Sequence, residues 1–265
     1  MAFSLTWLPE VLLAADLKVA EHPGWASRGR GEFGRPEGVM WHHTATTRLG
    51  NMPSLHTLVE GRSDLPGPLC HLGLARDGTY YVIAAGRANH AGGGDWKTIR
   101  DGNGRFIGIE AEHSGRAGDP WPDVQIDAYI RGTAALLKHI GRGADRCCGH
   151  GEYALPFGRK NDPRLDGQPD PREAMDRHRK MVQAAIDGHH VPRPLIPQVD
   201  AESRPTLRRG DRGDDVRAMQ GKLGLAVDGI FGPATEVRVR QFQRDKGLVA
   251  DGILGPKSWA ALDTA

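Results

Sequence analysis

Apolar and polar positions along the first 190 residues alternate with two different periods. Short apolar or alternating runs predict strands, at 38–43, 72–84 and 106–112, the second of them a hairpin with its turn at Asp77-Gly78. Helices are predicted where apolar residues recur every three or four positions, at 8–20, 123–140 and 171–187. Strands interleaved with helices indicate an α/β fold, in which a central mixed β-sheet is flanked by helices.

The last 60 residues contain an internal repeat. The segment Asp228-Gly-Ile-Phe-Gly-Pro-Ala-Thr recurs as Asp251-Gly-Ile-Leu-Gly-Pro-Lys-Ser. Asp-Gly favours a turn and Pro suits the first turn of a helix, so each copy predicts a turn followed by a helix. A third helix is predicted at 214–223, where Val216, Met219 and Leu223 share one face. These patterns predict a small all-α domain of three helices.

A proline-rich stretch separates the two patterned regions. Residues 189–205 contain four prolines and no helical period, which is typical of a semi-rigid linker. We therefore expect a first domain at 1–188, a linker at 189–205 and a second domain at 206–265.

Composition excludes several classes of function. The 35 Lys and Arg and the 33 Asp and Glu give a net charge of +2, so we expect no nucleic-acid partner, because phosphate binding needs clustered cations. No apolar run approaches the ~20 residues of a membrane span, so no membrane partner is expected. The first residues lack the basic start of a signal peptide. Cys70, Cys147 and Cys148 form no CxxC pair and are expected to be buried free thiols.

Histidines and an acidic residue at distant positions are candidates for a metal site. His42 and His43 end a predicted strand, and only one of them can face a given site, because neighbours in a strand point to opposite faces. His150 is predicted in a glycine-flanked turn, and Asp162 follows twelve residues later. Two histidines and one carboxylate make a catalytic zinc set with an open position for water. From spacing alone, satisfied structural histidines remain the alternative.

Five motifs bear on this hypothesis. They are Gly38-Val-Met-Trp-His-His-Thr-Ala-Thr46, Cys70-His-Leu-Gly-Leu-Ala-Arg-Asp-Gly-Thr79, Asn89-His-Ala-Gly92, Ile107-Gly-Ile-Glu-Ala-Glu112, and Gly149-His150 followed by Gly158-Arg-Lys-Asn-Asp-Pro163. In this order they resemble the zinc N-acetylmuramoyl-L-alanine amidase family, which shares its fold with phage T7 lysozyme and peptidoglycan recognition proteins. The loop 154–157 departs from the family spacing by extra residues.

The resemblance implies a ligand set and two catalytic residues. His42, His150 and Asp162 would hold a zinc ion (Zn²⁺), which activates a water molecule and polarises the scissile carbonyl. Glu110 would accept the proton of that water and pass it to the leaving amine. The ammonium group of Lys160 would stabilise the oxyanion of the tetrahedral intermediate.

Other residues are given weaker roles by the same resemblance. His90 and Trp96 match residues of the family's substrate groove, and His71 is expected beside the site, where it would orient a ligand or contact substrate. Glu112 is left open as either a partner of Glu110 on the same face or a structural carboxylate. His43 is expected to face away from the site and to be structural.

Residues 206–265 resemble the peptidoglycan-binding module found at the ends of many cell-wall hydrolases. The matching segments are 207–220, 228–235, Phe242-Gln243 and Gly247-Leu248. The module implies that the enzyme is held on the wall polymer, which raises its effective concentration there. Without it, the repeat alone would indicate an interaction module of unknown ligand.

Together the two resemblances imply a monomeric enzyme that cleaves the amide between N-acetylmuramic acid and L-alanine of bacterial peptidoglycan. A phage endolysin is expected, made in the host cytoplasm without a signal peptide and acting on the wall after release; a prophage copy is the other possible origin. Three alternatives stay open: a recognition protein that binds peptidoglycan without cutting it, a zinc endopeptidase that cuts the stem peptide, and a glycosidase with paired carboxylates.

Overall fold

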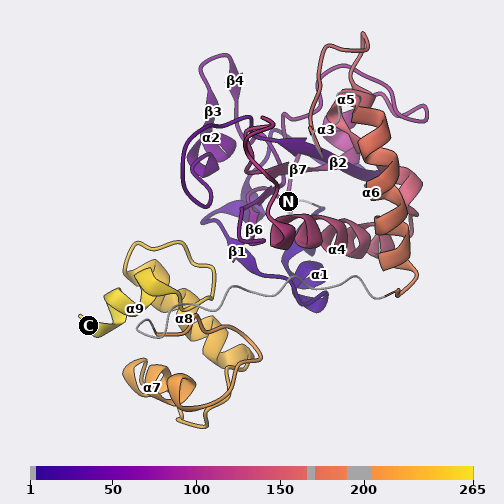
Figure 1. Ribbon diagram of the computed structural model, residues 1–265. Helices are drawn as coiled ribbons and strands as arrows, with labels where there is room; N and C mark the ends of the chain where they lie inside the picture. The colour runs from indigo at the N-terminus through magenta and orange to yellow at the C-terminus, as the bar shows by residue number, and fades with distance from the viewer. Residues whose placement is uncertain (1–3, 166–170, 190–203, 265) are drawn as a thin grey trace. The chain divides into compact units, whose positions relative to one another are not determined.

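A computed structural model of the protein describes residues 4–165, 171–189 and 204–264 (Figure 1). The chain divides into two compact units, the first containing a β-sheet and the second containing the three helices nearest the C-terminus. Residues 190–203, most of the predicted linker, lie outside the described residues, so the boundaries of the linker stay a prediction. No helix of the described ranges is long and apolar enough to cross a membrane.

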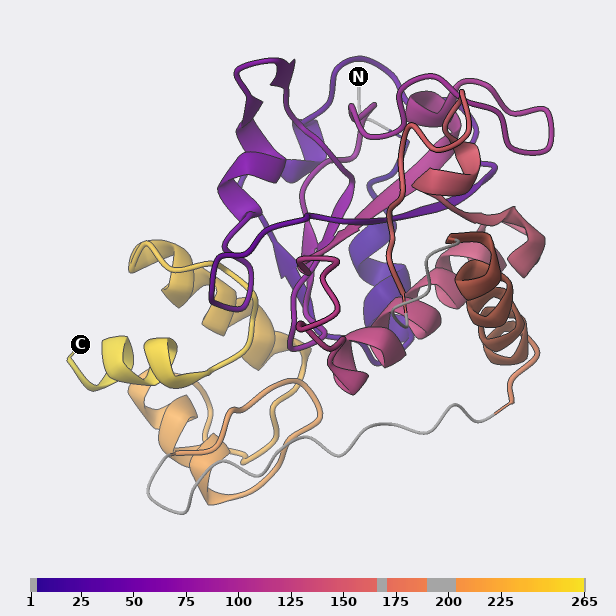
Figure 2. The same cartoon turned by 45° about the horizontal axis from the view of Figure 1, so that its top comes forward.

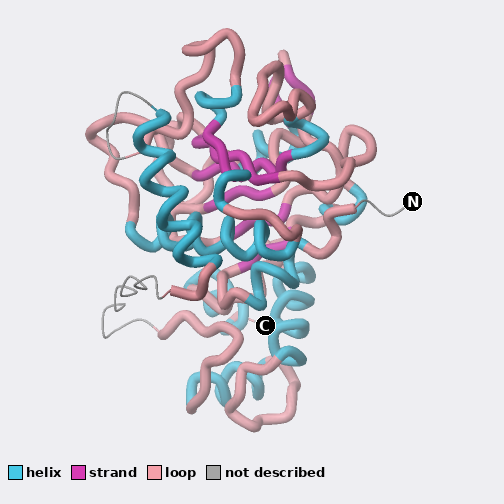
Figure 3. Tube along the Cα trace, turned by 90° about the vertical axis from the view of Figure 1, so that its right-hand side faces the viewer, coloured by secondary structure: helices cyan, strands magenta, loops and turns pink. Residues whose placement is uncertain are grey.

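A six-stranded sheet forms the centre of the first unit (Figure 3), with the strand order β1-β6-β5-β7-β2-β8. The bounds of these strands are β1 Val19–Glu21, β2 Gly38–His43, β5 Leu72–Leu74, β6 Tyr80–Val82, β7 Phe106–Ala111 and β8 Cys147–Gly149. Strands β5, β7, β2 and β8 run parallel, whereas β6 is antiparallel to β5, so the prediction of a mixed sheet is confirmed. A separate hairpin pairs β3 (Gly61–Arg62) with β4 (Leu65–Pro66).

Three helices pack on one face of this sheet, α1 (Leu8–Ala14), α4 (Asp123–His139) and α6 (Pro171–Ile186), with α4 and α6 side by side (Figure 2). Trp41 of β2 shows how the layers join. Its ring stacks on Tyr129 of α4 at 3.7 Å between centroids, and its indole N–H donates to the Thr133 hydroxyl at 2.8 Å. The shorter helical segments are η1 Trp25–Ser27, α2 Leu55–Glu60, α3 Gly102–Arg105, η2 Ala144–Arg146 and α5 His150–Tyr153.

Successive residues of β2 face opposite sides of the sheet, as the pleat requires. Val39 and Trp41 belong to the large core beneath the helices. Met40 instead packs in a smaller core with Phe106 and Tyr153. His42 therefore emerges on the face opposite Trp41.

The predicted helix at 8–20 is wrong in its second half. Helix α1 ends at Ala14, and Val19 begins strand β1. Asp16 has a φ of 57°, a left-handed conformation that an α-helix cannot continue through but that Asp tolerates. Val19 and Ala20 are buried because they join the edge of the sheet, a long-range pairing that local periodicity does not reveal.

The second unit contains α7 (Asp214–Lys222), α8 (Pro233–Asp245) and α9 (Pro256–Asp263), which confirms the predicted three-helix domain. The core residues that these helices and their connecting turns share are Leu207, Val216, Met219, Leu223, Phe231, Val239, Phe242, Leu254, Trp259 and Leu262. Burial of such side chains is the main favourable term for a unit of this size.

A buried glutamine holds each copy of the internal repeat. The Gln220 side chain accepts a hydrogen bond from the Gly229 amide and donates to the Asp228 carboxylate. Gln243 repeats the pattern, accepting from the Gly252 amide and donating to the Asp251 carboxylate. The sequence repeat is therefore also a repeat of side-chain contacts, in which one amide closes the Asp-Gly turn before the next helix.

Replacing Gln243 with leucine is expected to loosen the second unit. Gln243 is 1 % exposed, and its loss leaves the buried Gly252 N–H unpaired, at a cost of about 1–3 kcal/mol. Amide hydrogen exchange in the full chain should then speed up about 5- to 150-fold at α8 and α9. The exposed Gln241→Leu variant on the same helix is the control, and equal protection in the two variants would contradict this role.

Candidate active site

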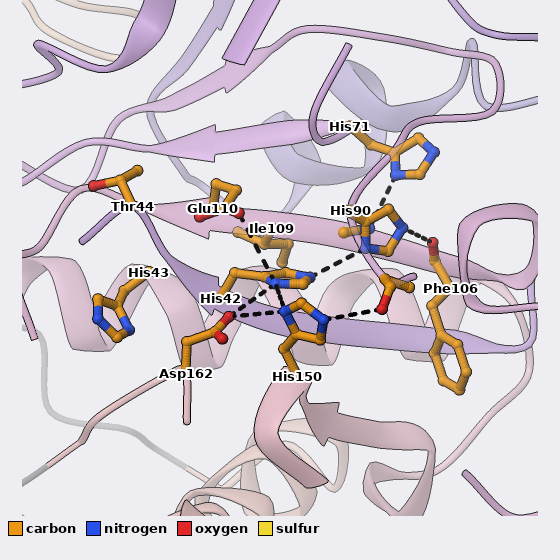
Figure 4. Close-up of polar contacts among 12 residues, drawn as sticks. His42, His43, Thr44, His71, His90, Phe106, Ile109, Glu110, His150 and Asp162 are labelled. Atoms are coloured by element: carbon orange, nitrogen blue, oxygen red, sulfur yellow. Dashed lines mark hydrogen bonds and ion pairs between the residues drawn. The ribbon is translucent and has the colours of Figure 1, made fainter. Parts of the chain in front are cut away.

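Side chains from distant parts of the chain meet at the carboxyl ends of two parallel strands (Figure 4). Strands β2 and β7 pair in register, so that His42 lies beside Glu110 and both side chains point to the same face. The separation between His42 Nδ1 and Glu110 Oε1 is 3.9 Å. The ends of parallel strands in an open α/β sheet are the usual place for a ligand site.

His150 reaches the same point from the end of β8. The sequence predicts a turn at this position, but Gly149 is the last residue of the strand and His150 is the first residue of helix α5. The Glu152 carboxylate accepts from the Gly149 amide at 2.8 Å, which favours the start of a helix. The Asp162 carbonyl accepts from the Gly151 amide at 2.7 Å and so brings the Asp162 side chain next to His150.

Three atoms of this cluster form a nearly equilateral triangle. His42 Nδ1, His150 Nδ1 and Asp162 Oδ2 lie 3.1 Å from one another on every side. A tetrahedral zinc ion with bonds of about 2.0–2.1 Å needs ligand atoms roughly 3.3 Å apart. Within the described ranges, this is the one group of three His, Cys, Asp or Glu side chains with its ligand atoms so close.

The hydrogen-bond partners of the imidazoles show that all three atoms present lone pairs. His150 Nε2 lies 2.9 Å from the Ala91 carbonyl oxygen, which can only accept, so in the neutral ring Nε2 carries the hydrogen and Nδ1 does not. His90 Nε2 donates in the same way to the Phe106 carbonyl at 3.1 Å, so His90 Nδ1 accepts from His42 Nε2, also at 3.1 Å. His42 Nδ1 is thereby left without a hydrogen.

Burial and the contacts within the cluster also favour a neutral His42 beside a charged Asp162. Desolvation lowers the pKa of His42 to about 4, so its ring is neutral at physiological pH. Burial alone would raise the pKa of Asp162, but its contacts with His150 and His42 bring that pKa below the ordinary value. Two imidazole lone pairs and a carboxylate oxygen at 3.1 Å repel one another unless a cation lies between them, so the donor set fits a zinc ion.

Glu110 and Lys160 flank the ligand cluster. Burial first, and the charge of Asp162 second, raise the pKa of Glu110 well above its ordinary value, whereas the positive charge of Lys160 opposes that shift. Glu110 Oε2 is buried and has no hydrogen-bond partner among the described residues. Lys160 is exposed in the loop before Asp162. The site thus offers a carboxylate with a raised proton affinity and an exposed cation near the same three atoms.

Comparison with protein families identifies the first unit. Residues 32–165, half of the chain, match the N-acetylmuramoyl-L-alanine amidase family. The chain belongs to this amidase family. Residues 212–262 match the family of peptidoglycan binding domains. A search of curated proteins gives no match.

Solved structures similar to this chain include a phage endolysin, an AmpD derivative and a clostridial amidase. The Burkholderia AP3 phage endolysin is 51 % identical over 22 % of this chain and only 24 % of its own length, with a TM-score of 0.22. The AmpD derivative is 22 % identical over 62 % of this chain and 94 % of its own, with a TM-score of 0.46. The amidase LysC from Clostridium intestinale URNW is 18 % identical over 60 % and 95 %, with a TM-score of 0.42.

The three residues predicted to contact substrate, His71, His90 and Trp96, lie in different surroundings. His90 contacts His42 rather than facing outward, and it is 7 % exposed. His71 is completely buried, and its Nδ1 accepts from the Gly108 amide at 2.9 Å, so it lies beside the site but not where a wall polymer could touch it. Trp96 is partly exposed, and its indole N–H donates to the Asp145 carbonyl at 3.2 Å.

The structure also places Glu112, whose role was left open, and His43, which was expected to face away from the site. Glu112 is fully buried, and its carboxylate accepts from the Thr44 hydroxyl and from the amide and hydroxyl of Ser54. These bonds make Glu112 a structural carboxylate that fixes the loop after β2. His43 points away from the ligand cluster (Figure 4) and accepts from the Arg164 amide at 3.3 Å.

The sequence patterns did not identify three residues that hold the site in place, Glu152, Arg179 and Tyr129. The Glu152 carboxylate, which caps α5, is itself held by two hydrogen bonds from Arg179 of α6, at 2.8 and 2.9 Å. The Tyr129 hydroxyl accepts from the His42 amide at 2.9 Å and lies 2.9 Å from the Ile109 carbonyl. Tyr129 lies on the apolar stripe of α4, three residues after Ile126, and a hydroxyl on a buried stripe was the available signal.

Replacing Tyr129 with phenylalanine is expected to lower the free energy of unfolding by about 1–3 kcal/mol, because the buried His42 N–H loses its acceptor. Urea unfolding measures the change. The Tyr80→Phe variant is the matched control. Among the described residues the Tyr80 hydroxyl makes one bond, to the Ala128 carbonyl at 2.9 Å, and its loss should cost less, about 1 kcal/mol. Equal stability of the Tyr129→Phe variant and the wild type would contradict this role.

Proposed function

We propose that this chain is a zinc-dependent hydrolase that cleaves the amide between N-acetylmuramic acid and L-alanine in peptidoglycan. The observation that carries the proposal is the triangle of His42, His150 and Asp162 atoms, whose three lone pairs converge at 3.1 Å. Membership in the amidase family supports the choice of bond. Glu110, 3.9 Å from one ligand atom, supports hydrolysis rather than binding alone.

Different residues would perform metal binding, proton transfer and stabilisation of the oxyanion. A zinc ion held by the three ligand atoms would supply Lewis acidity and lower the pKa of a bound water. The Glu110 carboxylate then takes a proton from the attacking water and returns it to the leaving nitrogen, for which its raised pKa is suited. The ammonium group of Lys160, which is exposed in the loop before Asp162, would stabilise negative charge on the carbonyl oxygen.

Metal analysis tests the zinc requirement. The purified chain should hold one zinc ion, lose its wall-clearing activity on treatment with a chelator, and regain it when one equivalent of zinc is restored. Full activity of the chelator-treated chain with less than a tenth of an equivalent of bound zinc would overturn the proposal.

We also propose that residues 206–265 tether the enzyme to its polymer. The match to peptidoglycan binding domains supports this division of labour. A chain truncated after residue 189 should keep the cleavage chemistry on soluble wall fragments but bind intact walls at least tenfold more weakly, because the second contact with the polymer is lost. Co-sedimentation with walls measures binding. Equal binding by the truncated chain would contradict the tethering role, and loss of all chemistry from a folded, zinc-loaded fragment would contradict the division.

The biological role we propose is that of an endolysin, which is made in the host cytoplasm and reaches the wall after release. The pairing of an amidase unit with a wall-binding unit supports it. Expression inside bacteria should leave cells intact until the membrane is permeabilised, and lysis should then follow within minutes. Cells that stay intact after permeabilisation, although the protein is active on their purified walls, would contradict this role.

A further inference from the structure

We propose that His90 is a positioning residue, which accepts a hydrogen bond from His42 Nε2 and thereby directs the lone pair of His42 Nδ1 at the metal. The inference rests on the proposed zinc site. It gives the segment Asn89-His-Ala-Gly92 a task different from the substrate contact that the sequence predicts. The evidence for this inference is the pair of contacts that the two ring nitrogens of His90 make.

The backbone sets the direction of the hydrogen bonds in this chain of groups. His90 Nε2 lies 3.1 Å from the Phe106 carbonyl oxygen, and His90 Nδ1 lies 3.1 Å from His42 Nε2. A carbonyl oxygen cannot donate, so the hydrogen of a neutral His90 belongs on Nε2 and its Nδ1 must accept. His42 then carries its hydrogen on Nε2.

The opposite arrangement is unfavourable at both ends. A hydrogen on His90 Nδ1 would leave its Nε2 lone pair facing the carbonyl oxygen at 3.1 Å, with no hydrogen between two acceptors. His42 would then carry its hydrogen on Nδ1, which points at His150 Nδ1 and Asp162 Oδ2. A hydrogen there would occupy the position of the metal.

The His90 ring is held in place by groups other than the ligands. The Asn103 side-chain oxygen accepts from the amides of His90 and Ala91, at 2.9 and 2.7 Å. Gly108 of β7 leaves room for the ring, since a Cβ atom at that position would lie 2.6 Å from His90 Nδ1. The edge of the buried His71 ring packs against it at 5.4 Å between centroids. His90 is therefore oriented before any metal arrives.

The neighbouring residue performs the same task for the second imidazole. The Ala91 carbonyl accepts from His150 Nε2 at 2.9 Å, which leaves His150 Nδ1 free of hydrogen. Two consecutive residues, His90 and Ala91, thus set the tautomers of both histidine ligands. Groups that orient metal-binding histidines in this way typically change metal affinity 10- to 100-fold when they are removed.

Two substitutions separate the acceptor function from simple packing. The amide oxygen of His90→Asn can reach the position of Nδ1 and accept from His42, although the bond to the Phe106 carbonyl is lost. His90→Gln places its amide near the position of Nε2 and leaves the Nδ1 position empty. We measure zinc affinity of the full chain by competition with a chromogenic chelator, and the protonated nitrogen of His42 by ¹⁵N NMR of the zinc-free chain.

We expect His90→Gln to lose zinc affinity 10- to 100-fold and His90→Asn to recover most of it. In the zinc-free wild type, His42 should carry its hydrogen on Nε2; in His90→Gln this preference should weaken. Equal affinities of His90→Gln and wild type, or a wild-type His42 with its hydrogen on Nδ1, would overturn the inference.

If the wild type takes up no zinc, the proposed function fails, while the NMR result still decides whether His90 sets the tautomer of His42. If His90→Gln does not fold, the wild-type spectrum decides alone.

Discussion

Replacing Asp162 with alanine is expected to reduce kcat/KM on peptidoglycan by about three orders of magnitude or more. The substitution removes the single charged ligand of the triangle, leaving His42 Nδ1 and His150 Nδ1 as the remaining pair at 3.1 Å. Metal-ion catalysis contributes several kcal/mol of transition-state stabilisation, and each 1.4 kcal/mol corresponds to about tenfold in rate. The appearance of stem peptides with a new amino-terminal L-alanine measures turnover. Zinc analysis of the same sample measures the occupancy of the metal site.

A surface aspartate provides the control for this variant. Asp145 is 55 % exposed and pairs with Lys97 at 2.8 Å, so Asp145→Ala should change activity and stability little, as expected of an exposed ion pair. An Asp162→Ala protein that keeps one equivalent of zinc and turns over within tenfold of wild type would remove Asp162 from the ligand set. Comparable turnover by a variant that holds no zinc would instead contradict the zinc requirement.

Replacing Glu110 with glutamine is expected to reduce kcat by about 10²- to 10⁴-fold while zinc stays bound. The amide keeps the shape of the carboxylate but cannot accept the proton of water. Because burial raises the pKa of Glu110, wild-type activity should fall as the pH is lowered through that raised pKa, where the carboxyl becomes protonated. Steady-state rates between pH 5 and 9, with zinc analysis at each end, measure the effect.

The buried Glu112 is the matched control for Glu110. Glu112→Gln should lower stability, since it disturbs the bonds from Thr44 and Ser54, but should not cause a comparable loss of kcat. The low-pH fall in rate should be absent from Glu110→Gln and present in Glu112→Gln. A large loss of kcat in both variants, with zinc bound, would show that the two carboxylates act together.

The sequence predicts the elements of this protein best where one hydrophobic period continues over a whole segment. The apolar stripe at 123–140 becomes α4, which ends one residue earlier, and the apolar run at 38–43 becomes β2. The prediction of one helix at 8–20 is wrong in its second half because the apolar positions of this segment suit a helix throughout. What ends α1 is the left-handed conformation of Asp16 and the pairing of β1 with the distant β6.

The ligand set could be inferred from motifs, but the groups that orient it could not. His42 and His90 are 48 residues apart, and their contact depends on which nitrogen of each ring faces the other. Tyr129 supports His42 through backbone atoms, which leave no trace in the residue types at positions 42 or 109. Hydrogen-bond direction and burial are properties of the folded chain, and the sequence alone shows neither.

Mass spectrometry of peptidoglycan digested by the zinc-loaded full chain tests the proposed reaction most directly. We expect glycan strands with free lactyl groups on N-acetylmuramic acid, together with stem peptides that begin with an unmodified L-alanine. Products that keep L-alanine on the glycan and carry new amino termini within the stem peptide would show an endopeptidase instead. Walls that are bound but yield no new termini would show a binding protein.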